Sequence, residues 1–180
     1  MDKMTKTYER VTDNHVFFWG GPMSNWFPSS FEMEVGGEKL KFSNTEQYFM
    51  YMKAKEFNDE ENAKLILLKG SDQKAAKTLG RRVRNYDDGR WGKVRYDVML
   101  KANMAKFTQN GELRKHILSD EFKGKGFVEG SPFDTIWGIG IDWKTAPDDE
   151  SEWLGQNLLG KVLDEVRDAI QKEQTKLEDK

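Results

Sequence analysis

The segment spanning residues 31–54 constrains the fold more than any other part of this chain. Apolar and polar residues alternate on both sides of Gly36-Gly37, a pattern that is typical of a β-hairpin with a two-residue turn. The alternation predicts two cross-strand pairs on one face, Phe31 with Phe42 and Met33 with Leu40. The second strand leads directly into an almost wholly apolar helix, which begins near Ser43 and carries Glu46 in its first turn.

Glu46 shares one face of this helix with an amine. At about 100° per residue, Glu46, Met50 and Lys53 fall on the same stripe, next to aromatic side chains, and such a pair suits acid–base chemistry. Two structural alternatives compete with this interpretation. Ser43-x-x-Glu46 also fits a capping box, in which the glutamate accepts from the Ser43 amide, and Lys53 also fits an ammonium that reaches past buried rings to water.

Length and composition predict a single domain that folds without disulfides or metals. A chain of 180 residues is long enough to bury about 70% of its unfolded surface. We expect a polar N-terminal extension over residues 1–14, one domain over residues 15–170 and a polar tail over residues 171–180. Cysteine is absent, and the two histidines, His15 and His116, lie far apart, so neither a metal site nor a cofactor is expected.

The net charge of −2 argues against a protein that grips duplex DNA along its whole surface. A local basic patch runs from Gly80 to Arg95. It fits either a solvated helix face or a contact to a phosphate-bearing small ligand, which needs only one or two arginines. The N-terminus carries no apolar signal core, and no segment approaches the roughly 18 apolar residues of a membrane span. We therefore expect a cytoplasmic protein without a membrane partner or an obligate protein partner.

The remaining periodicity predicts two more short strands and several helices. We expect strands at residues 15–19 and within residues 124–130, and helices over residues 58–70, 71–80, 91–107, 112–118 and 151–170. The last helix is expected to bury Leu154 with the apolar residues that follow it, and to end in a frayed tail from Gln171. The expected fold is α+β: one compact, mostly helical domain with a small antiparallel sheet.

The segment from Ser131 to Gly140 is too apolar to be a simple connector. It places an acid, Asp134, and an indole, Trp137, among glycine and proline residues, which is typical of a rigid loop that presents side chains inward. The alternative is a turn in which Asp134 caps backbone amides while Trp137 fills the core. With Glu46 the chain offers two carboxylates for N-glycoside cleavage and several aromatic faces that can hold a flat base.

The order of several separated motifs resembles the YbiA-like, or NADAR, family over residues 17–167. The motifs are Ser24-Asn25 with Phe27, Glu46-Gln47-Tyr48-Phe49 with Lys53-Ala54, Leu79-Gly80-Arg81, Trp91 with Val98-Met99, Lys106-Phe107, Ser131 and Asp134 with Trp137-Gly138-Ile139-Gly140, and Asn157-Leu158-Leu159-Gly160. Some members have a histidine where this chain has Gln47, and this departure shifts the acid–base role to Glu46. The resemblance implies a YbiA-like fold and hydrolysis of an N-glycosidic bond between ribose and a base-like amine.

The resemblance also implies catalytic roles. Glu46 is the principal acid or base, and Asp134 orients or stabilises the oxocarbenium-like sugar. Lys53 either pairs with Glu46 and tunes it or forms a Schiff base with the ring-opened sugar, which would require burial to lower its pKa; we prefer tuning. The implied substrate-binding residues are Asn25 for sugar hydroxyls, Arg81 for phosphate, Trp137 and Trp91 for stacking on the leaving base, and Gln47 and Gly138.

Two substrate classes follow from the resemblance. Similar family members split phosphorylated ribosylamino-pyrimidine intermediates of riboflavin synthesis, and others remove ADP-ribose from guanine in DNA, so the partner is a ribosyl-phosphate, an ADP-ribosyl compound or modified or single-stranded DNA. The alternative from another class is a non-catalytic module that binds ADP-ribose or NAD-derived ligands, and Glu46 discriminates between them because stacking and a phosphate contact need no acid. A nicotinamide-dependent oxidoreductase is disfavoured, since no Gly-x-Gly-x-x-Gly follows a strand.

Overall fold

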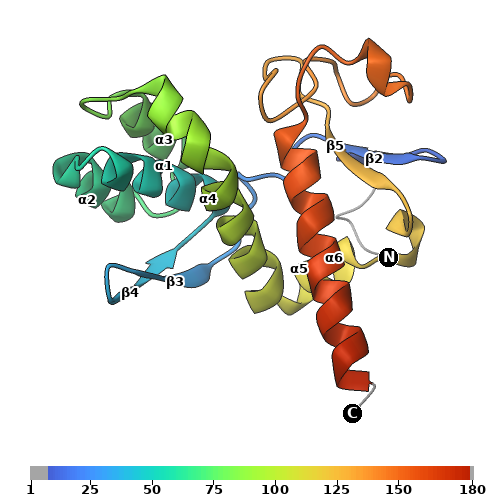
Figure 1. Ribbon diagram of the computed structural model, residues 1–180, viewed down its shortest axis with the longest axis horizontal. Helices are drawn as coiled ribbons and strands as arrows, with labels where there is room; N and C mark the ends of the chain where they lie inside the picture. The colour runs from blue at the N-terminus through green and yellow to red at the C-terminus, as the bar shows by residue number, and fades with distance from the viewer. Residues whose placement is uncertain (1–7, 179–180) are drawn as a thin grey trace. The chain divides into compact units, whose positions relative to one another are not determined.

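The computed structural model describes residues 8–178. Their contacts group into two compact units, one formed by Asn25–Asn110 and the other by residues 8–24 together with residues 111–178. Each unit combines helices with a small sheet, which confirms the α+β class (Figure 1). The single domain over residues 15–170 stays a prediction.

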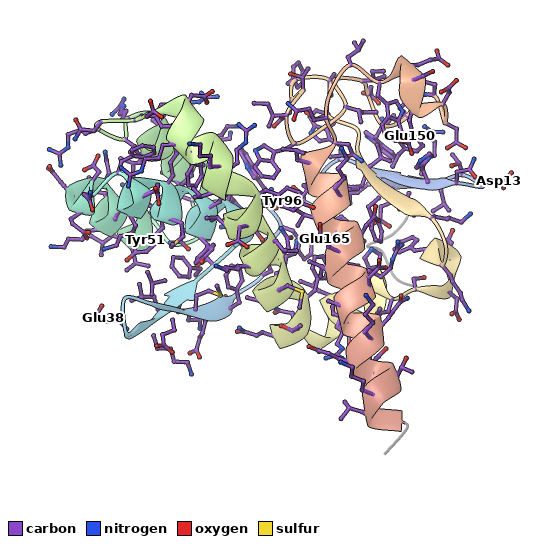
Figure 2. All side chains as sticks on the ribbon, viewed as in Figure 1. Asp13, Glu38, Tyr51, Tyr96, Glu150 and Glu165 are labelled. Carbon is purple, nitrogen blue, oxygen red and sulfur yellow. The ribbon has the colours of Figure 1, made fainter. Side chains whose placement is uncertain are left out.

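The Asn25–Asn110 unit begins with the predicted hairpin. β3 (Phe31–Val35) pairs antiparallel with β4 (Glu38–Phe42), and Figure 2 shows Glu38 at the turn that joins them. The register contains the two predicted pairs, Phe31 with Phe42 and Met33 with Leu40. Gly36 and Gly37 form the turn with φ values of 61° and 83°, a backbone region that glycine adopts without strain.

Within the described residues, four helices complete this unit: α1 (Thr45–Glu56), α2 (Glu60–Leu68), α3 (Gln73–Arg81) and α4 (Asp88–Gln109). An aspartate side chain caps the N-terminus of α2, of α3 and of α4. α3 begins later than predicted because Asp72, rather than Ser71, is the N-cap residue and its side chain accepts from the Ala75 amide at 2.9 Å.

Aromatic rings tie α1 to the hairpin. The Phe42 ring lies 5.0 Å from the Tyr48 ring and 5.3 Å from the Tyr51 ring, in edge-to-face contacts, and Figure 2 shows Tyr51 on α1. On α3, Gly80 leaves room for Met50 of α1: a Cβ at Gly80 would lie 2.0 Å from the Met50 sulfur. The helix that carries Glu46 is therefore fixed by contacts to both the hairpin and α3.

The other unit contains a three-stranded sheet. β2 (His15–Phe18) lies at its centre, antiparallel to β1 (Glu9–Val11) and parallel to β5 (Gly126–Glu129), so this sheet is mixed whereas the hairpin is purely antiparallel. β1 lies within the stretch that composition assigns to a polar extension. Its residues are half-buried and make polar contacts, such as Glu9 Oε1 to His116 Nε2 at 2.7 Å, which explains why an apolar pattern could not reveal it.

Helices cover this sheet in the same unit. α6 (Leu158–Glu178) packs along β5 (Figure 1), and the shorter elements are α5 (Gly111–Ile117) and two 3-10 turns, η1 (Asp120–Phe122) and η2 (Glu150–Glu152). One buried cluster of this unit consists of Phe17, Val128, Ile139, Trp143 and Ala146. Strand and loop residues therefore share one core, and this fixes the segment that carries Asp134.

The predicted helix over residues 151–170 is wrong at both ends. Leu154 precedes α6 and is 72% exposed, and the helix continues past Gln171 to Glu178. The helix begins late because Asn157 adopts a φ of 52° and its side chain accepts from the Glu129 amide and donates to the Phe127 carbonyl. It ends late because the residues after Gln171 are mainly lysine, glutamate and glutamine, which are good helix formers.

Candidate functional site

The N-terminus of α1 is capped without Glu46. Asn44 is the N-cap residue, and its Oδ1 accepts from the Gln47 amide at 2.9 Å, while Gln47 Oε1 accepts from the Ser43 amide at 2.8 Å. The capping box that we considered for Ser43 and Glu46 is therefore wrong, because Asn44 and Gln47 take those two roles one residue later. The capping box therefore does not explain why a glutamate stands at position 46.

Gln47 uses its whole side chain within the fold. Its Nε2 donates to the carbonyls of Ile66 and Leu67, at 3.1 Å each, while its Oε1 is bonded to Ser43. The side chain is 1% exposed. The predicted substrate-binding role of Gln47 has no support from this geometry, which instead gives the residue a structural role between the start of α1 and the end of α2.

Glu46 lies in a buried polar neighbourhood at the second position of α1. Its side chain is buried, and its backbone amide donates to the carbonyl of Asn25 at 3.0 Å. Asn25 is buried as well, and its Oδ1 accepts from Asn103 Nδ2 at 3.4 Å. The structure thus joins the backbones of Glu46 and Asn25, the predicted acid and the predicted sugar-binding residue, and adds Asn103, which the sequence analysis missed.

Lys53 lies on the same face of α1, as predicted. Its Nζ is 4.3 Å from the centre of the Tyr86 ring, a cation–π contact. Partial burial lowers the pKa of Lys53 below its usual value, the negative charges of Glu46 and Asp88 raise it, and the positive charge of Arg81 lowers it further. Glu46 and Arg81 are therefore both electrostatic neighbours of Lys53 within one unit.

Tyr86 holds the position of the Lys53 ammonium. The Tyr86 hydroxyl donates to Asp88 Oδ1 at 2.7 Å, and the Tyr86 ring contacts Phe57 edge-on at 5.4 Å. Lys53 is half-buried, and its ammonium contacts the Tyr86 ring. The alternative in which this ammonium simply reaches water does not explain that contact. Tyr86 and Asp88 were not among the predicted site residues, since neither stands at a periodic position of the sequence.

The basic patch between Gly80 and Arg95 is partly neutralised. Arg84 forms ion pairs with Asp59 at 2.7 Å and with Glu61 at 3.2 Å, and Arg90 pairs with Glu56. Arg81 is exposed at the end of α3 and forms no ion pair among the described residues. Arg81 therefore keeps a charge that is available to an anionic ligand.

Trp91 belongs to the core of its unit. It is 4% exposed, and its ring lies 5.1 Å from the Phe49 ring. A side chain this deeply buried contributes to stability by packing, and the geometry does not support the predicted stacking of Trp91 on a leaving base.

Asp134 forms the turn that we considered as the alternative to catalysis. Its Oδ1 accepts from the amides of Ile136 at 2.9 Å and of Trp137 at 2.8 Å. Both Asp134 and Trp137 are half-buried in the unit that contains the three-stranded sheet. The turn uses the Oδ1 atom of Asp134. The predicted role of Asp134 in stabilising a sugar cation therefore depends on its Oδ2 atom and on its negative charge.

Gly138 is required by close backbone packing. A Cβ at this position would lie 2.9 Å from the carbonyl oxygens of Asp134 and Glu129. The carbonyls of Gly138 and Trp137 accept from the amides of Asn157 and Leu159 at 3.2 and 3.0 Å. These contacts hold the loop backbone in place and give Gly138 a structural reason, while its substrate-binding role stays a prediction.

The described residues add two negative findings. They contain no group of three or more histidine, cysteine, aspartate or glutamate side chains placed to hold a metal ion. None of their helices combines the length and apolar character needed to cross a membrane.

Comparisons with known proteins agree on one family. The NADAR domain model matches residues 17–171. N-glycosidase R617 of Acanthamoeba polyphaga mimivirus is 41% identical over 170 residues, covering 89% of this chain and 98% of the relative. Protein irg-1 of Caenorhabditis elegans is 38% identical, with 92% and 85% covered, and N-glycosidase YbiA of Shigella boydii is 31% identical, with 83% and 81% covered.

A solved structure agrees with the sequence comparisons. The NMR structure of Escherichia coli YbiA aligns with a TM-score of 0.71 and 26% identity, covering 96% of this chain and 94% of that chain. The family model, the relatives and the solved structure all identify the same family, and this chain belongs to the NADAR family.

Proposed function

We propose that this N-glycosidase hydrolyses the bond between a phosphorylated ribose and a base-like amine. Its family and the N-glycosidase relatives support the reaction class, that of a hydrolase acting on N-glycosyl compounds. The observation that carries the substrate proposal is the buried Glu46, whose backbone amide bonds the Asn25 carbonyl and whose negative charge acts on Lys53, which also lies within electrostatic reach of Arg81.

Glu46 performs the proton transfers in the proposed reaction. The bond between the anomeric carbon and the base nitrogen breaks, the nitrogen receives a proton, and a water oxygen bonds to the anomeric carbon after losing its own proton. Glu46 takes the proton of the water as a base and passes it to the departing nitrogen, a role that fits its place in the first turn of α1, where negative charge is favoured.

The remaining contacts divide between the ends of the substrate. Asn25 bonds the sugar hydroxyls, and Arg81 binds the phosphate. The predicted roles of Trp137, stacking on the leaving base, and of Asp134, stabilising the oxocarbenium-like sugar by its charge, come from the family resemblance and concern residues of the unit that contains the three-stranded sheet. Both phosphorylated ribosylamino-pyrimidines and ADP-ribosyl-guanine in DNA carry all of these groups, and both remain candidate substrates.

Lys53 has two candidate roles. Its attraction to Glu46 supports tuning, which we prefer, and its lowered pKa meets the condition for attack on a ring-opened sugar. Borohydride added during turnover discriminates between them. A sugar adduct on Lys53, detected by mass spectrometry, would establish the Schiff base, and an unmodified Lys53 supports tuning.

A product assay tests the function. The purified protein is incubated separately with a ribosylamino-pyrimidine phosphate and with a DNA strand that carries ADP-ribosylated guanine, and the released sugar is measured. We expect release from at least one of them. Binding of both without release would instead favour the non-catalytic ligand-binding module.

A further inference from the structure

The Asn103 amide has one buried oxygen without a hydrogen-bond partner. Asn103 lies on α4 and is 0% exposed. Its Nδ2 donates to the Met99 carbonyl at 3.1 Å and to Asn25 Oδ1 at 3.4 Å, whereas its Oδ1 has no partner in the part of the chain that the structure describes. Buried polar atoms in folded proteins are nearly always bonded, so this acceptor calls for a donor from outside the chain.

The orientation of the Asn103 amide follows from its neighbours. Both contacts of the Nδ2 atom are to oxygen acceptors, so exchanging the amide nitrogen and oxygen would place an oxygen against two oxygens. The unpaired atom is therefore an acceptor, and its partner must carry an O–H or N–H group.

Two hydrogen bonds through Asn25 link Asn103 to the backbone of Glu46. Asn25 receives the Asn103 amide through its side chain and the Glu46 backbone amide through its carbonyl, at 3.0 Å. Asn103 is thus separated from the start of α1 by a single residue. A ribose whose anomeric carbon faces Glu46 would bring the hydroxyl of the neighbouring carbon close to the same group of residues.

We propose that Asn103 Oδ1 accepts a hydrogen bond from the 2′-hydroxyl of the ribose; this inference rests on the proposed function. Phosphate oxygens would repel the amide oxygen, and a sugar that reacts at Glu46 lies nearer to Asn25 and Asn103 than the base that leaves it. A hydroxyl is a donor of the size of one water molecule. Hydrogen bonds to the 2-hydroxyl strengthen as the sugar becomes oxocarbenium-like, so this contact favours the transition state.

The test uses sugar phosphates rather than turnover. Binding of ribose 5-phosphate and of 2-deoxyribose 5-phosphate is measured by calorimetry for the wild-type protein and for Asn103→Leu. We expect the wild type to bind the ribose compound about 10-fold more tightly, and the variant to bind both with affinities within about twofold of each other. The wild-type comparison needs no variant and therefore stands even if Asn103→Leu folds poorly.

Asn110→Leu is the matched control. Asn110 ends the same helix, and its Nδ2 donates to the carbonyls of Ser30 and Lys106, so the substitution removes a purely structural amide. We expect this control to keep the ribose preference. Equal binding of the two sugars by the wild type, or a preference that survives Asn103→Leu, would overturn the inference and leave a buried water as the partner of Oδ1.

The outcomes separate this inference from the proposed function. A ribose preference that depends on Asn103, in a protein that hydrolyses neither N-riboside, supports the inference and removes the hydrolysis proposal. Hydrolysis of an N-riboside by a protein that shows no preference for the 2′-hydroxyl would support the proposed function and overturn the inference about Asn103.

Discussion

At the scale of single residues, Glu46 is the group whose role the structure changes most. The local sequence offers it a capping role, but Asn44 and Gln47 perform the capping. The capping box therefore does not account for its buried carboxylate, which lies in the first turn of a helix, where negative charge is favoured.

The first prediction concerns this carboxylate. Glu46→Gln should keep the fold and lower turnover by about 10²–10⁴-fold, because the amide is of similar size but exchanges no proton near neutral pH. Initial rates and the urea midpoint are measured for both proteins. Wild-type turnover in the variant would remove Glu46 from the mechanism.

The second prediction compares two tryptophans. Trp91→Ala should destabilise the protein by about 3–5 kcal/mol, since it empties a core position against Phe49. Trp137→Ala should weaken ligand binding by about 1–3 kcal/mol if its ring stacks on the base. Urea unfolding and ligand titration of both variants give the comparison, and a Trp137 variant with unchanged affinity contradicts stacking.

At the scale of elements, close helix packing decides where the site residues lie. α1 and α3 approach so closely at Gly80 that Met50 occupies the space of a side chain. Gly92 of α4, in contrast, is exposed, and a Cβ there would meet nothing within 4 Å. The same substitution should therefore have opposite effects at two helical glycines of one unit.

The third prediction follows from that contrast. Gly92→Ala should stabilise the protein by about 0.5–1 kcal/mol through helix propensity. Gly80→Ala should destabilise it by about 1–3 kcal/mol, because the whole Met50 side chain must move. Urea midpoints test both. A neutral Gly80→Ala would show that α1 and α3 separate easily.

At the scale of the whole molecule, each unit contains an aspartate held in its charged form. Burial alone would raise the pKa of Asp59, but hydrogen bonds from Arg84 and Asn62 hold it well below its usual range. In the other unit, hydrogen bonds from Thr12, His15 and Asn14 lower the pKa of Asp148 to about 2. Both carboxylates release their protons more readily in the folded chain than in the unfolded chain.

The fourth prediction is a loss of stability in acid. The contribution of Asp148 is complete above its unfolded pKa, at about 4, and disappears as the pH falls toward the folded value. Asp148→Asn should be less stable than wild type at pH 6 and lose less stability between about pH 4 and pH 2. Asp97→Asn, which removes an exposed carboxylate of α4, is the control for general charge effects. Parallel acid profiles for wild type and Asp148→Asn would refute the assignment.

The fifth prediction concerns the form of any nucleic-acid substrate. A stacked duplex base must be extruded at a cost of a few kcal/mol before a pocket can enclose it, and a chain with net charge −2 offers little phosphate-binding surface in return. Modified single strands should therefore bind more tightly than modified duplex, and plain duplex should bind poorly. Titrations at physiological salt test this order, and equal tight binding of all three would contradict it.

The sequence by itself determined the features that depend on local order. The hairpin and its register follow from alternation around Gly36-Gly37, and the shared face of Glu46 and Lys53 follows from helical periodicity. The family also follows from the order of the motifs, since separated short motifs in a fixed order are a property of the chain.

Only the tertiary structure decided which polar groups serve the fold and which remain for chemistry. A hydrogen-bond partner far away in the sequence leaves no periodic signal: Asn103 bonds Asn25, and Gln47 bonds the end of α2. For the same reason the sequence pattern did not predict β1, whose side chains make polar contacts. It also predicted the start of α6 too early, because the positive φ of Asn157 accompanies a hydrogen bond from β5. Burial and pairing depend on distant residues, and local sequence patterns do not record them.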